Sequence, residues 1–173
     1  MSEALDIVTV YLDHLADHAT QDALNCLAPN FEMEFAGAGF TMSKSQAATA
    51  LAWDAGANGR LDWQLVDEAP PTVTIQGSEG NDFLDLIGIG ALGFRSVFTI
   101  SPPGLISHQL HETSWGAVSL SDAMAPLISW ASEHDPEELA EIYPEGKMSY
   151  SGPMAVRWVR LAEKWKDKTT AKE

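Results

Sequence analysis

Two runs of alternating side chains around a Pro-Pro-Gly turn, at residues 94–115, constrain this chain more than any other part of it. The segment reads FRSVFTISPPGLISHQLHETSW. Because successive side chains of a strand point to opposite faces, the alternation predicts a hairpin with one dry face and one wet face. The second run divides its side chains between two faces, with Ser107, Gln109, His111 and Thr113 on one and Ile106, His108 and Leu110 on the other. Polar groups at every second position of such a hairpin can line a pocket.

Elsewhere, the periodicity predicts helices toward both ends of the chain and strands in its middle. Residues 31–35 alternate apolar side chains with Glu32 and Glu34, which predicts a strand with a dry inner face. Helices are predicted to begin at Ser2, Thr20, Ser43, Ser121, Asp135 and Pro153. Further strands are predicted at 62–67, 72–76, 81–91, 94–101 and 105–115. This order indicates an α+β fold.

Composition limits the partners that we expect. The formal net charge is −15, and the only basic residues before Lys147 are Lys44, Arg60 and Arg95. So acidic a body repels phosphates, and nucleic acid is not an expected partner.

Cys26 is the single cysteine, so no internal disulfide is possible, and its apolar setting favours an inert thiol over a nucleophile. The first residues lack a signal-peptide pattern, and no apolar run approaches the ~18 residues of a membrane span. We therefore expect a soluble, cytoplasmic protein with no membrane partner.

The predicted last helix is basic and carries a stripe of large apolar side chains. The stripe consists of Met154, Trp158, Leu161 and Trp165. An exposed stripe of this size is rare on a soluble monomer. The helix is therefore expected to dock either on the acidic body of its own chain or across a homodimer, and we expect a homodimer.

The front of the chain, VYLDHLADHATQDALNCLAPNFEMEF, and the hairpin at its back together resemble the nuclear transport factor 2-like, or SnoaL-like, superfamily. The resemblance covers residues 4 to about 116. It implies a cone, in which a strongly curved antiparallel sheet wraps around N-terminal helices and leaves an apolar cavity. Residues 1–116 would then form the cone, and residues 117–173 a helical extension packed on the same domain or on a dimer partner.

Members of this superfamily include ketosteroid isomerase, limonene epoxide hydrolase and polyketide cyclases, and the resemblance carries over only part of each catalytic set. Tyr11 lies where steroid isomerases place a tyrosine that donates to the developing enolate oxygen. Their catalytic base would fall near Phe35 and their protonated acid near Ser96, so both carboxylates are missing. The resemblance therefore argues against steroid isomerisation by that mechanism.

The epoxide hydrolase set is also incomplete, but it draws attention to His111 and Asp85. The last-strand carboxylate of that enzyme corresponds here to His111, and its strand-four aspartate falls near Asp85, whereas its partnering arginine is Phe83. Polyketide cyclases use an acid or base on the same last strand, a role that His111 could fill.

His111 is the first candidate for moving a proton, with Asp85 and Tyr11 assisting. If its face of the hairpin looks into a cavity, the imidazole is suited to general acid–base work; otherwise it bonds a neighbouring side chain and titrates uneventfully. Asp85 stands in an apolar run, DFLDLIGIG, and would either pair with His111 or lie on the outer, wet face. Tyr11 would be a pocket donor or a residue at the helix rim.

The sequence thus predicts a small apolar molecule as ligand, bound with or without isomerase, cyclase or hydrolase-like chemistry. The expected ligand-binding residues are Phe31, Met33, Phe35, Trp53, Ser96, Phe98, Ile100, Gln109 and Thr113. No cofactor is expected, and no metal, because His14 and His18 have helical ligand spacing but no evident third ligand. The alternative is a non-catalytic protein-interaction or dimerisation module in which the cavity is incidental.

Overall fold

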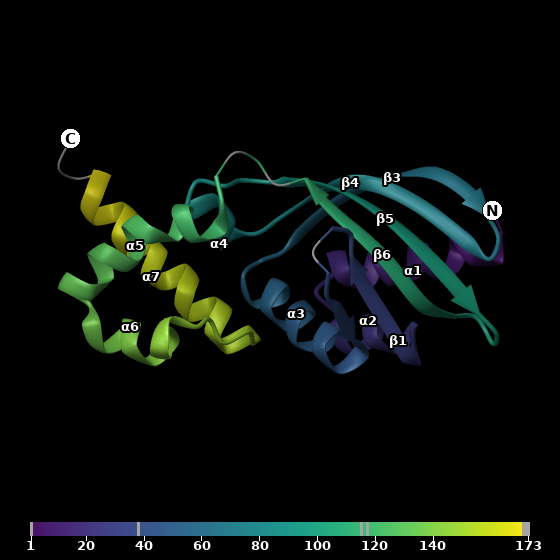
Figure 1. Ribbon diagram of the computed structural model, residues 1–173, viewed down its shortest axis with the longest axis horizontal. Helices are drawn as coiled ribbons and strands as arrows, with labels where there is room; N and C mark the ends of the chain where they lie inside the picture. The colour runs from purple at the N-terminus through teal and green to yellow at the C-terminus, as the bar shows by residue number, and fades with distance from the viewer. Residues whose placement is uncertain (1, 38, 115, 117, 171–173) are drawn as a thin grey trace.

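A curved sheet occupies one end of the protein, and a group of helices occupies the other (Figure 1). The computed structural model describes residues 2–37, 39–114, 116 and 118–170. The first elements are α1 (Glu3–Ala16), α2 (Thr20–Asn25), β1 (Leu27–Phe35), β2 (Thr41–Ser43) and α3 (Lys44–Gly56). The next are β3 (Arg60–Ala69), β4 (Thr72–Gly80), α4 (Asp82–Leu86), β5 (Leu92–Ser101) and β6 (Leu105–Ser114). After the sheet come α5 (Leu120–His134), α6 (Pro136–Ile142), a 3-10 turn (Pro144–Gly146) and α7 (Gly152–Thr170).

The sheet has the strand order β2-β1-β6-β5-β4-β3. The predicted hairpin is present as β5 and β6, with Ser96 opposite His111 and Phe98 opposite Gln109; Trp115, its last predicted residue, lies outside the described residues. The expected α+β cone is confirmed. The sheet is mixed, however, because β1 pairs parallel with β6, placing Phe35 beside His111.

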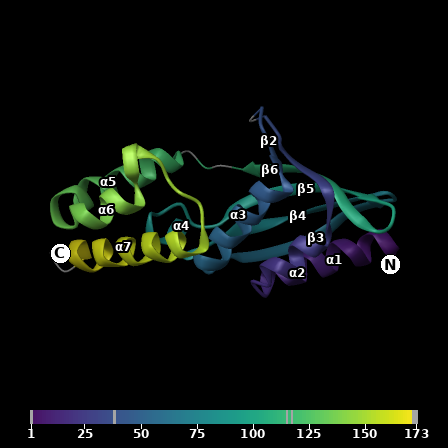
Figure 2. The ribbon, with the colours of Figure 1, turned by 90° about the horizontal axis from the view of Figure 1, so that it is seen from below.

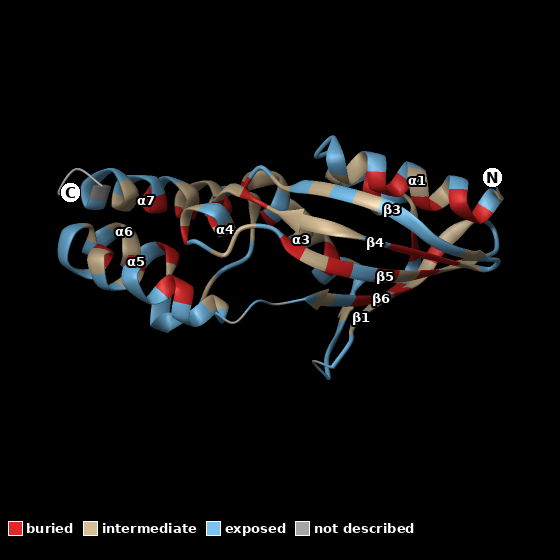
Figure 3. Ribbon diagram, turned by 90° about the horizontal axis from the view of Figure 1, so that it is seen from above, coloured by how far each residue is buried: buried red, intermediate tan, exposed pale blue. Residues whose placement is uncertain are grey.

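Helix α1 fills the concave side of the sheet and forms the core of the cone. Ser2 caps the helix by accepting a hydrogen bond from the backbone N–H of Leu5, so an apolar stripe can begin at once. Buried residues of α1, β1, β4, β5 and β6 pack together, among them Val8, Tyr11, Phe31, Ile75, Phe98 and Ile106. Figure 3 shows the buried residues of α1 gathered along the helix side that faces the sheet.

A second core lies between the cone and the C-terminal helices. Trp158 of α7 is fully buried there against Phe83 of α4 and Tyr143, with ring centroids 5.5 and 5.6 Å apart. Trp53 of α3 belongs to the same core. The apolar stripe of α7 is therefore covered by its own chain, which is one of the two dockings that the sequence left open. Figure 2 shows α7 running alongside α5 and α6 and reaching α3 with its first turn.

Two glycines allow backbones to approach closely. At Gly77 of β4, a Cβ atom would lie 2.9 Å from Cα of Trp63 on β3, and closer still to the carbonyl oxygen of Asp62. At Gly56, a Cβ atom would meet the backbone of Gly152, where α3 meets the start of α7. The first glycine lets the edge of the sheet curl tightly, and the second lets the extension sit directly against the cone.

The strand predicted at 81–91 is wrong. Residues 82–86 form helix α4, and strand β5 begins only at Leu92. Asn81 starts the helix, since its side chain accepts from the backbone N–H of Leu84. A short apolar run is compatible with a buried strand or a short helix. Here the N-terminal cap provided by Asn81 favours the helix.

Candidate functional site

His111 lies on the concave face of the sheet and is held at both ring nitrogens. Its Nδ1 is 2.8 Å from Oγ of Ser96, and its Nε2 is 3.2 Å from Oε1 of Glu79. The imidazole stacks on Phe94, with ring centroids 5.7 Å apart, and meets the edge of Phe35 at the same distance. The residue is 8% exposed, so its polar contacts are made in an environment of aromatic rings.

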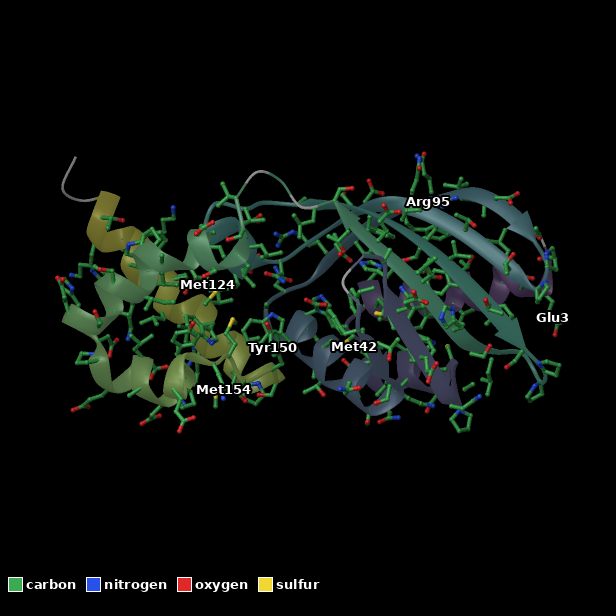
Figure 4. The ribbon with its side chains drawn as sticks, viewed as in Figure 1. Glu3, Met42, Arg95, Met124, Tyr150 and Met154 are labelled. Atoms are coloured by element: carbon green, nitrogen blue, oxygen red, sulfur yellow. The ribbon has the colours of Figure 1, made fainter. Side chains whose placement is uncertain are left out.

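The hydrogen bonds continue inward from Ser96. Nε2 of Gln109 donates to Oγ of Ser96 at 3.1 Å, and both residues are buried. Oε1 of Gln109 is buried and has no partner in the described part of the chain. Four side chains from three neighbouring strands therefore form one row: Gln109, Ser96, His111 and Glu79. Arg95, between Phe94 and Ser96, points away from this face (Figure 4).

Two carboxylates stand at the open end of the row. Glu79 accepts from His111 and, at 3.5 Å, from Thr113, and its side chain is 34% exposed. Asp54, at the end of α3, accepts from the amide of buried Asn81 at 3.3 Å. Desolvation and the charge of Glu79 raise the pKa of Asp54 to about 6, although Asp54 is open to solvent. The contribution of Glu79 indicates that the two carboxylates are close enough for their charges to repel.

Tyr11 is buried in the cone rather than placed at a rim. Its ring meets Phe98 edge-on at 5.9 Å, and 2% of the residue is exposed. Burial, together with the nearby Cys26 and Asp54, raises the pKa of the Tyr11 hydroxyl well above its usual range. The phenol therefore stays protonated at ordinary pH and is a donor rather than a base. None of the described hydrogen bonds joins it to His111.

Asp85 lies apart from this row, and its predicted pairing with His111 is corrected. It stands on α4, its side chain is 52% exposed, and it pairs with Arg60, which also binds Asp82. The helical turn in place of a strand turns Asp85 outward. Arg60 and Asp85 line a surface hollow of about 340 Å³, to which Glu79 also contributes.

Most of the predicted ligand-binding residues share the concave face, but Trp53 does not line it. The residues that pack in or border the cone are Phe31, Met33, Phe35, Ser96, Phe98, Ile100, Gln109 and Thr113. Trp53 packs in the second core, against Phe83 and Tyr150. Tyr150 lies between α3 and the extension in Figure 4. Sequence reasoning placed Trp53 in the lining because it is one of the few bulky side chains of an alanine-rich helix.

A larger hollow, of about 590 Å³, lies outside the cone where α2, β1 and α3 meet. Of the predicted lining residues, this hollow and the smaller one touch Phe31 alone. The enclosed apolar cavity therefore stays a prediction. Among the described residues no group of three or more metal-ligating side chains converges, and no helix is long and apolar enough to cross a membrane.

Comparison with known proteins identifies the fold but not the activity. No family model matches the chain, and no curated protein matches it. Among solved structures, the epoxide hydrolase/cyclase-like enzyme SalBIII of pyran ring formation in salinomycin is 16% identical, with a TM-score of 0.56, covering 69% of this chain and 92% of its own. A ketosteroid isomerase candidate from Kribbella flavida is 13% identical, with a TM-score of 0.55, covering 68% and 82%. A polyketide cyclase candidate from Xanthomonas campestris is 15% identical, with a TM-score of 0.52, covering 64% and 89%. The chain thus has the nuclear transport factor 2-like fold.

Proposed function

We propose that this nuclear transport factor 2-like cone binds a small, mainly apolar molecule on its concave face and moves a proton to or from it at the hydrogen-bonded row that contains His111. The reaction would be of the isomerase, cyclase or hydrolase-like kind and would need no cofactor. The names of the three similar structures fall within these kinds of chemistry. These names suggest the types of reaction to consider, but they do not assign a role to any residue of this chain.

The observation that carries the proposal is the buried imidazole with a partner on each nitrogen. Polar groups are costly to bury, so a connected row of four on an otherwise aromatic face is more than packing requires. Histidine is also the commonest general acid or base. An apolar molecule would contact the rings of Phe35 and Phe94, and the hydrogen-bonded row would exchange the proton with it.

Two probes test the proposal without knowledge of the natural ligand. The first is N-phenyl-1-naphthylamine, a neutral fluorophore that brightens in apolar sites. The second is 5-nitrobenzisoxazole, an apolar molecule that opens when a base removes one proton. His111→Ala should lower the rate of opening about tenfold or more, because the row loses either its general acid or base or the residue that orients it. His108→Ala is the matched control, because His108 lies on the other face of the same strand.

Binding and opening that are equal in His111→Ala, His108→Ala and the unaltered protein would refute the role of His111. Failure of the unaltered protein to bind the fluorophore or to open the isoxazole would refute the proposed function as a whole.

A second candidate function is self-association, because β3 is an edge strand with two exposed apolar side chains. Leu65 and Val66 are 43% and 44% exposed. Unpaired strand edges with apolar side chains favour pairing with another copy. A homodimer formed at β3 would appear as a doubled mass in light scattering and would dissociate in Val66→Lys. A monomeric mass for the unaltered chain at high concentration would exclude it.

A further inference from the structure

Both nitrogens of His111 are already engaged, so a bound molecule has no free nitrogen to meet. Ser96 occupies Nδ1 and Glu79 occupies Nε2. The side chain of His111 is only 9% exposed, whereas that of Glu79 is 34% exposed. The accessible end of the row is therefore the carboxylate and not the imidazole.

The directions of the hydrogen bonds follow from the amide of Gln109. Its Nε2 can only donate, so Oγ of Ser96 accepts at that contact and has its own hydrogen left for Nδ1 of His111. Nδ1 then accepts, and the imidazole proton resides on Nε2. Nε2 donates that proton to Oε1 of Glu79. The row thus runs in one direction, from the buried amide to the carboxylate.

The two oxygens of Glu79 are used differently. Oε1 accepts from both His111 and Thr113, while Oε2 accepts from no residue that the structure describes. A carboxylate anchored through one oxygen has its other oxygen free and fixed in direction. This is the arrangement that a positioned base requires.

We propose that Glu79 is the group that exchanges a proton with the bound molecule, and that Gln109, Ser96 and His111 are the positioning residues that orient it. The inference rests on the proposed function and names the residue of the row that acts as its acid or base. With 5-nitrobenzisoxazole, Oε2 of Glu79 takes the proton from the ring carbon. The electron pair of that C–H bond forms the nitrile as the N–O bond breaks, and the negative charge leaves on the phenolate oxygen. Glu79 ends as the neutral acid and is reset by loss of the proton to water.

The first test reads the imidazole protons directly, by nitrogen-15 NMR of the full chain at about pH 9, where histidine is ordinarily neutral. The His111 signals are assigned by their loss in His111→Ala. The unaltered protein should carry the proton on Nε2. Glu79→Ala should keep it there, because Gln109 and Ser96 still impose the direction, and adding Gln109→Leu should release a mixture of both tautomers. A proton on Nδ1 in the unaltered protein, or an equal mixture in both variants, would overturn the positioning role.

The second test compares kcat and KM for isoxazole opening. Glu79→Gln should lower kcat about 100-fold or more, whereas His111→Gln should lower it about tenfold, because the carboxylate remains and loses only its orientation. KM should change little in either variant. Glu112→Gln is the matched control, since Glu112 is exposed on the opposite face of β6 and should leave both constants unchanged.

The outcomes separate the two proposals. A full rate in Glu79→Gln together with loss of turnover in His111→Gln would overturn the inference and leave the proposed function standing. An unaltered protein that fails to bind the fluorophore or to open the isoxazole would overturn both.

Discussion

Replacing Gly77 with alanine should destabilise the cone by about 2–4 kcal/mol. The added Cβ atom would lie 2.9 Å from Cα of Trp63, whereas two carbon atoms prefer about 3.5–4.0 Å. Strand β3 must therefore move outward by roughly 0.6–1 Å to clear this atom, and further to clear the carbonyl oxygen of Asp62. Overpacking of this kind costs about 1–3 kcal/mol, and loosening two backbone hydrogen bonds between β3 and β4 adds about 2 kcal/mol. The better strand propensity of alanine returns about 0.5–1 kcal/mol.

Urea denaturation of the full chain, followed by circular dichroism, measures this free energy of unfolding. Gly93→Ala is the matched control, because Gly93 lies in the neighbouring strand β5 and its nearest foreign atom is an ordinary 3.6 Å from the added carbon. That variant should be neutral or slightly more stable. If Gly77→Ala and Gly93→Ala both stay within about 0.5 kcal/mol of the unaltered protein, the close approach of β3 does not shape the sheet and the reasoning is refuted.

Three further changes test the carboxylate of Asp54 and the second core. The raised pKa of Asp54 means that the folded protein holds its proton more tightly than the unfolded chain, so stability should fall as the pH rises from 3.8 through about 6. Because Asp54 is exposed, this change in stability should stay below about 1 kcal/mol. In thermal melts at several pH values, Asp54→Asn should lose this dependence of stability on pH. The same pH dependence in the variant and the unaltered protein would show that Asp54 is not its source. Trp158→Ala should cost about 3–5 kcal/mol. Trp158→Phe should cost much less, since it also removes a buried N–H that has no hydrogen-bond partner among the described residues. Equal losses of stability for the two variants in chemical denaturation would show that packing is not the cause. A chain ending at residue 116 should aggregate in size-exclusion chromatography, because Trp53 and Phe83 lose their cover, and a soluble, cooperatively melting fragment would contradict this.

The sequence predicted the hairpin and its inward face because strand alternation is a local property. Gln109 and His111 are two residues apart, so they share a face whatever else the chain does. Ser96 comes opposite His111 through the register of a tight turn, which the Pro-Pro-Gly segment restricts. These residues are the buried part of the candidate site.

The accessible part of the site could not be predicted in this way, because it depends on the ends of elements. Glu79 lies where β4 runs on past the predicted strand, and Asp54 is one acid near the end of an alanine-rich helix. Neither residue has a local pattern that sets it apart. A signal was present at Asn81, whose capping position predicts the turn of helix that carries Asp85 outward. Trp53 was misplaced because one bulky residue on a helix does not indicate which of two cores it joins.

The parallel pairing of β1 with β6 has a consequence for how this protein can fold while it is being synthesised. Leu27 takes Ile106 as its partner, and Phe35 takes His111. During synthesis, the first strand leaves the ribosome long before the strand that must lie beside it exists. Until then the only described strand with which it can pair is the short β2, so its other edge stays unpaired. Closing so long a loop is entropically slow, so nascent chains halted before residue 106 would be the ones that need a chaperone.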